Sequence, residues 1–173
     1  FSYRLNEAET EQLKSILSIR DALVGNRVEY PLPVDLNNKK GAGTGLLVGG
    51  NLKTIETLAG SASDIHADGM ILFVEDVGEY LYSIDRMFFS LKRTGKLNRL
   101  AGLLIGGFKV KPDDPGDEFG RSVYNIVLDH VSPFQYPVCF NFPVGHQKVN
   151  FALKCGVKHQ LTVNDQEVIF KEV

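Results

Sequence analysis

Apolar residues follow two spacings that alternate along the chain and predict alternating strands and helices. Unbroken apolar runs predict buried strands at residues 70–75, 100–105 and 138–142. Between the first two, apolar residues recur at i, i+3, i+4 and i+7, the period of a helix face, at Ile84, Met87, Phe88 and Leu91. A second amphipathic helix is expected from Phe119 to His130. Strands that alternate with helices predict an α/β fold with some parallel pairing.

The last segment has a different pattern. Residues 161–163 and 168–170 are short apolar runs on either side of Asn164-Asp165, a spacing typical of a β-hairpin. The hairpin adds antiparallel strands, so we expect a mixed sheet with a C-terminal hairpin.

The first forty residues carry little core-forming pattern. A helix is predicted over residues 6–19, because Asn6 and Glu9 have the spacing of a capping box. Residues 27–36 should be extended, since each proline disfavours helix at the residue before it. We therefore divide the chain into residues 1–40, a linker or the start of a domain, and residues 41–173, the principal domain.

Glycine recurs between residues 41 and 50, before Asn51. We expect a strand at 46–48 and a short helix from residue 52, with Asn51 at the turn. A phosphate-binding loop would need Gly-Lys-Ser or Gly-Lys-Thr, which does not follow. The glycines are better explained by a close approach of backbone to a neighbour or ligand. Asn51 has two interpretations, as a helix cap or as an amide offered to a substrate.

Composition excludes several classes of partner. The 173 residues carry 19 basic and 21 acidic side chains, so no basic excess indicates nucleic acid or an anionic membrane. No apolar run reaches the roughly 18 residues of a membrane span. Four histidines and two cysteines, without metal-ligand spacing, argue against a structural metal. Cys139 and Cys155 are expected to be buried free thiols, which fits the cytoplasm. The first residue is Phe1, so we expect an upstream segment to be missing.

Candidate chemistry centres on an acid and a histidine. Glu75 and Asp76 end a buried strand, where α/β proteins place their sites, and His146 follows Gly145 in a loop. A buried acid can orient a histidine and stabilise its charged form, as in a hydrolase triad. The alternative is that both carboxylates are solvated caps of the next helix and that His146 has no catalytic role. No serine has the G-x-S-x-G context of a nucleophile, so we expect one domain of a larger enzyme with two of three catalytic groups.

Several motifs resemble the C-terminal domain of the LD-carboxypeptidases, the serine peptidases of the muramoyltetrapeptide carboxypeptidase and microcin-immunity type. They are Gly49-Gly50-Asn51, Ile71 to Glu79, Tyr82 to Met87, and Gly145-His146. The resemblance implies a swivelling β/β/α fold and a Ser-Glu-His catalytic set, with the serine in an N-terminal domain that has no counterpart here. It assigns the glutamate to Glu75 and the histidine to His146, and substrate binding to Gly50 and Asn51. It implies no metal or organic cofactor.

The chain departs from the family pattern at two places. Tyr80-Leu81-Tyr82-Ser83 stands where many members have Glu-Pro-Tyr-Arg, and Gln147 stands where many have glycine. Both leave the acid and the base intact and concern substrate preference.

The resemblance implies that the whole enzyme removes a terminal D-amino acid from a murein tetrapeptide during peptidoglycan recycling. One alternative is a microcin-immunity-type hydrolase of acyl-nucleotide amides, and another is a non-catalytic binding or interaction domain. The expected partners are the murein peptide and the missing N-terminal domain. An apolar face left uncovered by that domain could also make the chain a homodimer. This chain alone should be inactive, because it lacks the nucleophile.

Overall fold

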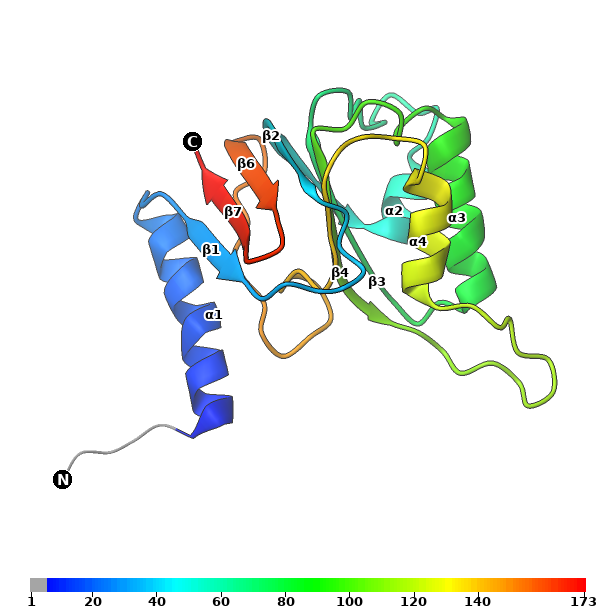
Figure 1. Cartoon of the computed structure of the whole chain (residues 1–173), viewed down its shortest axis with the longest axis horizontal. Coiled ribbons are helices and arrows are strands. Elements are labelled where there is room, and N and C mark those ends of the chain that lie inside the picture. The colour runs from blue at the N-terminus through cyan, green and yellow to red at the C-terminus, as the bar shows by residue number, and fades with distance from the viewer. Residues whose placement is uncertain (1–5) are drawn as a thin grey trace.

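One mixed sheet of seven strands, in the order β1-β7-β6-β2-β3-β4-β5, organises the computed structural model, which describes residues 6–173 (Figure 1). The strands are β1 (Glu29–Leu32), β2 (Gly41–Asn51), β3 (Ile71–Val77), β4 (Gly102–Lys109), β5 (Val138–Cys139), β6 (Lys158–Val163) and β7 (Val168–Glu172). The helices are α1 (Glu7–Leu23), α2 (Leu52–Thr57), α3 (Leu81–Arg93) and α4 (Val123–Val131). The predicted α/β class with a mixed sheet and a C-terminal hairpin is confirmed.

Strand β2 joins two kinds of pairing. Residues 41–46 pair antiparallel with β6, and residues 47–51 pair parallel with β3. Strands β3, β4 and β5 continue the parallel half, so their carboxyl ends meet at one edge of the sheet. That edge is where ligands bind in open α/β sheets.

The glycine-rich run at residues 41–45 is itself part of strand β2 and does not merely precede it. We expected a strand at 46–48 only, but β2 begins at Gly41 because its first half has a partner in β6. A Cβ on Gly43 would lie 1.7 Å from the carbonyl oxygen of Ala101, and one on Gly45 would lie 2.2 Å from that of Gly69. The missing side chains of Gly43 and Gly45 therefore leave room for the backbone of Ala101 and Gly69. The sequence had indicated such a close approach of backbone to a neighbour.

Other boundaries also differ from expectation. Strand β4 runs through Gly106-Gly107 to Lys109, because its ladder with β3 continues past a bulge at residues 74–76. Strand β5 stops at Cys139 and not at residue 142, and Asn141 then turns the chain with a left-handed φ of 53°. Helix α4 begins at Val123 and not at residue 119, because Ser122 caps it.

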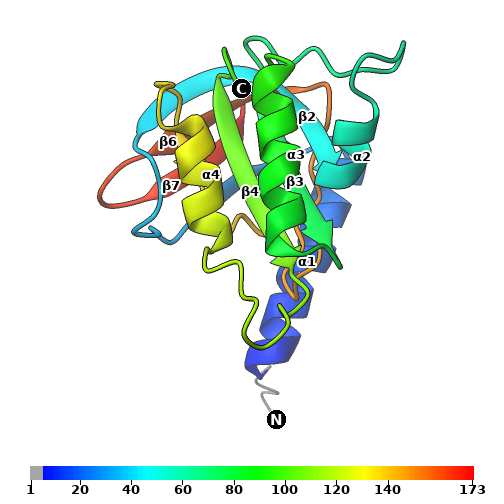
Figure 2. The same ribbon diagram turned by 90° about the vertical axis from the view of Figure 1, so that its right-hand side faces the viewer.

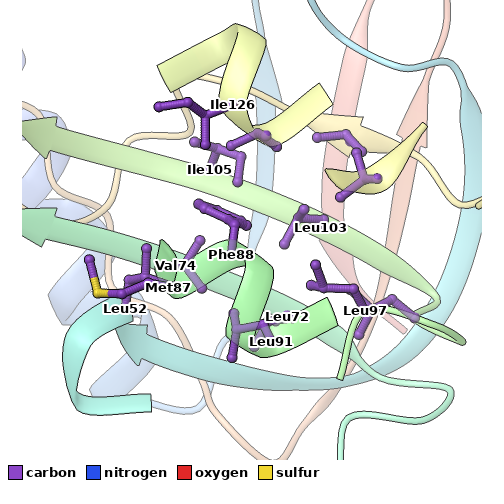
Figure 3. Packing of buried hydrophobic residues seen from close by; sticks show 14 of the residues in the cluster. Leu52, Leu72, Val74, Met87, Phe88, Leu91, Leu97, Leu103, Ile105 and Ile126 are labelled. Atoms are coloured by element: carbon purple, nitrogen blue, oxygen red, sulfur yellow. The ribbon is translucent and has the colours of Figure 1, made fainter. Parts of the chain in front are cut away.

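Helices α2, α3 and α4 cover one face of the parallel strands, and α1 lies on the other side of the molecule (Figures 1 and 2). Phe88 of α3 is fully buried and lies among Val74, Leu103 and Ile105 (Figure 3). A second core on the opposite face gathers Phe142, Leu161 and Phe170. The parallel strands are therefore buried on both faces.

Residues 6–40 contribute a helix and an edge strand to the same fold. The predicted capping box is present, since Asn6 and Glu9 bond each other's backbone N–H at the start of α1. Strand β1 pairs antiparallel with β7, from the pair Glu29 and Lys171 to Leu32 and Val168. The extended segment predicted around residues 27–36 is thus an edge strand. In the described part of the chain, no helix combines the length and apolarity needed to cross a membrane.

Candidate active site

Glu75 lies near the end of β3, opposite Asn51 in the parallel register with β2. On its other side the ladder with β4 shifts between Val74 and Asp76, so Glu75 sits in a bulge. Bulges re-aim side chains and are common next to active sites. Glu75 is 8% exposed, and its carboxylate points to the loop that follows β5.

His146 lies in that loop, and the structure brings it to Glu75 as predicted. The ring Nδ1 is 2.6 Å from Glu75 Oε2. An ionised carboxylate only accepts hydrogen bonds, so Nδ1 carries the proton in this contact and Nε2 holds the lone pair. The His146 side chain is 46% exposed and the Glu75 side chain 11%. The acid is therefore buried, while the imidazole is half-exposed and its Nε2 has no partner among the described residues, an arrangement suited to a general base.

Glycines make this contact possible. A Cβ on Gly145 would lie 2.5 Å from Glu75 Cβ and 2.8 Å from its Oε2. A Cβ on Gly106 would lie 2.6 Å from the carbonyl oxygen of Val144. Gly107 donates its N–H to the same carbonyl at 2.8 Å. The Gly-Gly pair of β4 therefore seats the histidine loop directly against the end of the sheet.

Gln147, one of the departures from the family pattern, braces the loop. Its Nε2 donates to the carbonyl oxygens of Phe142 and Val144, at 2.5 and 3.0 Å. Its backbone N–H donates to Gly145 O at 2.9 Å. In this chain Gln147 thus has a structural task next to His146.

Asn51 caps α2, the first of its two interpretations. Its Oδ1 accepts hydrogen bonds from Thr54 N at 3.0 Å and Thr54 Oγ1 at 3.2 Å. Its Nδ2 is bonded to no other described side chain or backbone group, so the amide N–H groups can still reach a ligand. Gly50 precedes it with a φ of 152°, and nothing lies within 4 Å of the position of a Cβ there. The substrate-binding role of both residues remains a prediction.

Asp76 has a task that the sequence did not reveal. It is 3% exposed, and its Oδ2 accepts the N–H of Lys53 at 2.9 Å while Oδ1 accepts that of Val77 at 2.7 Å. The alternative for residues 75 and 76 was that both carboxylates are exposed to solvent and cap the following helix. Instead, both are buried, and Asp76 holds the first turn of the preceding helix, α2, beside the site.

The remaining candidates lie elsewhere. His130 is buried and bonds Asp85 Oδ1 at 2.9 Å on the helical face. Cys139 is buried, as expected, but Cys155 is exposed, because Gly156 turns the chain beside it with a φ of 77°. No serine, threonine or cysteine of residues 6–173 is hydrogen-bonded to His146. Over the same residues, no three His, Cys, Asp or Glu side chains are grouped closely enough to hold a metal.

The comparisons with known proteins place the chain in a family. The family model described as the LD-carboxypeptidase C-terminal domain matches residues 44–161. A murein tetrapeptide carboxypeptidase of Pseudomonas aeruginosa is 31% identical over 150 residues, which are 86% of this chain and 47% of the relative. The microcin C7 self-immunity protein MccF of Escherichia coli is 26% identical over 153 residues, 85% of this chain and 43% of that protein.

The fold is shared with solved structures. The crystal structure of a muramoyltetrapeptide carboxypeptidase from Oxalobacter formigenes superimposes with a TM-score of 0.80 and 24% identity, covering 99% of this chain and 56% of the other. The structure thus places this chain in the α/β class, with a carboxylate–histidine pair at one edge of its mixed sheet. The chain belongs to the LD-carboxypeptidase family and carries its C-terminal domain. It spans about half the length of the curated relatives it matches.

Proposed function

We propose that this chain supplies the base and the orienting acid of a serine-type LD-carboxypeptidase. The observation that carries the proposal is the 2.6 Å contact between His146 Nδ1 and Glu75 Oε2, which leaves Nε2 of the half-exposed ring without a partner among residues 6–173. The serine and the oxyanion donors come from an N-terminal domain of the same family. This division explains why no serine, threonine or cysteine among residues 6–173 is hydrogen-bonded to His146.

The reaction is an acyl transfer in two steps. His146 Nε2 takes the proton of the serine hydroxyl as its oxygen attacks the carbonyl carbon of the scissile amide. The imidazolium then gives that proton to the departing amine of the D-amino acid, leaving an acyl-enzyme. Water repeats the sequence, with His146 again as the base, and releases the shortened peptide. Glu75 fixes the tautomer and stabilises each imidazolium.

The substrate class is a murein tetrapeptide with a terminal D-amino acid. The name of the Pseudomonas aeruginosa relative supports this choice. Asn51 lies beside Glu75 in the register of the sheet, so its free Nδ2–H groups can hold a substrate carbonyl or carboxylate. We place the reaction in the cytoplasm, as part of peptidoglycan recycling.

An exposed apolar face on α1 supports the proposal of a second domain. Five large apolar side chains of this helix and its end are 39% to 83% exposed: Leu13, Ile16, Ile19, Leu23 and Val24. Patches of this kind mark sites of protein contact. We propose that the N-terminal domain covers part of this side of the molecule, with self-association of the isolated chain as the alternative.

A second candidate is a hydrolase of acyl-nucleotide amides, favoured by the similarity to the microcin C7 self-immunity protein. The acid and base would act in the same way on a different amide. A non-catalytic interaction domain is the third possibility, and it would leave the ordered pair of His146 and Glu75 without a chemical role.

The test joins this chain to a family N-terminal domain that carries the nucleophilic serine. D-Alanine release from L-Ala-γ-D-Glu-meso-diaminopimelate-D-Ala is measured beside cleavage of an aminoacyl-sulfamoyl-adenosine. We expect release of D-alanine by the joined protein and none by the 173-residue chain alone. Cleavage of the nucleotide amide only would favour the second candidate, and cleavage of neither would favour the interaction domain.

A further inference from the structure

The loop that carries His146 is tied to a helix far away in the sequence. Asn150 donates its backbone N–H to Ser15 Oγ of α1 at 3.0 Å, across 135 positions of sequence. Ala152 does the same to Ser18 Oγ at 3.0 Å. In Figure 1 this loop, drawn in orange, lies between β1 and β4. Helix α1 therefore fixes the backbone of the loop just beyond the histidine.

Asn150 also reaches back toward the site. Its Oδ1 accepts the N–H of Gly145 at 3.2 Å. Gly145 precedes His146 and is the residue whose Cβ position falls on the Glu75 side chain. Asn150 thus links two parts of the protein. Its backbone N–H bonds Ser15 of α1, and its side chain bonds the N–H of Gly145, where the loop comes closest to Glu75.

Ser15 is itself oriented for this contact. Its hydroxyl donates to Glu11 O at 3.4 Å, one helical turn earlier, so a lone pair faces the Asn150 N–H. His146, by contrast, has a half-exposed ring with a single side-chain partner. A ring held by one hydrogen bond depends on its backbone for its orientation, because the exposed side offers no packing to stop rotation.

We propose that Asn150 is a positioning residue that sets His146 Nδ1 against Glu75, and that Ser15 of α1 holds Asn150 in place for that purpose. The inference rests on the proposed function, in which the Nε2 lone pair of His146 is the base. It goes beyond that function because it gives α1, which lies away from the strand end that carries Glu75, a part in positioning the base.

The first experiment reads the imidazole directly in the 173-residue chain. Long-range ¹H–¹⁵N NMR spectra report which ring nitrogen of His146 is protonated. We expect one tautomer, with the proton on Nδ1, in the unmodified chain. Asn150→Ala and Ser15→Ala should give a mixture of tautomers, and Asn150→Asp and Ser15→Thr, which keep the acceptor oxygens, should restore the single form.

Ser18→Ala is the matched control. It removes the same kind of hydrogen bond, from a loop backbone N–H to a serine hydroxyl of α1, two residues further along the loop, where Asn150 is not involved. We expect it to lower the melting temperature as much as Ser15→Ala while the His146 spectrum stays unchanged. An unchanged His146 spectrum in folded Asn150→Ala, or equal spectral changes in Ser15→Ala and Ser18→Ala, would overturn the proposal. Should Asn150→Ala fail to fold, the comparison of Ser15→Ala with Ser15→Thr decides.

The second experiment uses the chain joined to its nucleophile domain. Misplacement of a catalytic group by about 1 Å can cost roughly 100-fold in rate, so Asn150→Ala should lower kcat 10- to 100-fold with KM little changed. Asn150→Asp should recover most of the rate. If the joined protein shows no hydrolysis at all, the proposed function is wrong. The NMR experiment still tests the positioning of His146 independently, because it uses the 173-residue chain alone. Normal kcat in Asn150→Ala together with an altered tautomer would contradict the positioning role.

Discussion

Gly145 lies so close to Glu75 that any side chain at position 145 would occupy the space of the carboxylate. A Cβ at this position would lie 2.5 Å from Glu75 Cβ and 2.6 Å from Glu75 Cγ, and the φ of Gly145 is 89°. Two constraints thus act on one residue: a left-handed backbone and the acid that orients His146.

Gly145→Ala should therefore be more harmful than an ordinary glycine substitution. The left-handed backbone alone costs an alanine about 1–2 kcal/mol, and the overlap with Glu75 adds about 1–3 kcal/mol. Gly156→Ala is the control, because Gly156 has a φ of 77° and nothing within 4 Å of its Cβ position. Urea denaturation of both variants should show the larger loss for Gly145→Ala. Equal losses would mean that the loop can move away from Glu75 at no cost.

Asn51 has a capping oxygen and a free amide nitrogen, and two substitutions separate them. Asn51→Ala should lower the free energy of unfolding by about 1 kcal/mol, the usual loss for a helix cap. Asn51→Asp keeps the oxygen that accepts from Thr54 N and should retain the stability. In the enzyme with its nucleophile domain, both variants lack the amide N–H groups, so KM should rise in both. An unchanged KM for Asn51→Asp would restrict Asn51 to capping.

His159 should make the fold less stable in mild acid. It is fully buried, stacked on Phe170 with ring centroids 4.6 Å apart, and its Nε2 has no partner among the described residues. Burial lowers the pKa of His159, against weaker opposing effects of the Val157 carbonyl and Glu172 and a further lowering by Lys154. The unfolded chain, with a histidine pKa near about 6.5, then binds more protons than the native state.

The stability that depends on neutral His159 is therefore fully present above about pH 6.5. It is lost progressively as the pH falls from there toward the lowered pKa of His159. Urea denaturation between pH 7.5 and 5 measures the slope. His159→Phe keeps a ring against Phe170 and removes the titration, so the slope should flatten. The exposed His66, changed to Gln, is the control and should leave it as it was. A slope that survives in His159→Phe would assign the acid sensitivity to other groups.

The two cysteines should react at very different rates. Burial raises the pKa of Cys139 to about 12, and its thiol is closed to solvent, whereas Cys155 is exposed. A disulfide reagent at pH 8 should modify one thiol rapidly in the native chain and two in urea. The variant Cys155→Ser should show no rapid phase, and rapid native reaction of that variant would contradict the burial of Cys139.

Local pattern was enough to predict the elements that are stabilised by their own neighbours. The amphipathic face of α3, the hairpin of β6 and β7 and the capping box of α1 each depend on residues a few positions apart. Strand β2 was underestimated because its first half is defined by β6, more than 100 residues later. Glycine-rich sequence has little strand propensity of its own, so only the partner reveals it. Strand β4 was shortened for the same reason.

The residues of the candidate site also differ in whether the sequence alone could predict their roles. Glu75 and His146 could be proposed from a strand end, a loop and a family resemblance. The tasks of Asp76, Gly145 and Asn150 could not, because each depends on a distance between segments that the sequence does not place. Asp76 gave a weak signal, as a second carboxylate at the strand end, but the helix that it holds precedes it rather than follows it.

The catalytic roles of Glu75 and His146 are tested most directly by steady-state kinetics of D-alanine release from the tetrapeptide. The assay uses the chain joined to its nucleophile domain and compares Glu75→Gln and His146→Ala with the unmodified protein. Glu75→Gln keeps the shape of the acid but not its charge, and we expect a loss of about 10⁴-fold in kcat. His146→Ala should lose as much or more, because the members of a triad act as a unit, while His66→Gln should keep full activity. Turnover within tenfold of the unmodified protein in either Glu75→Gln or His146→Ala would contradict the account.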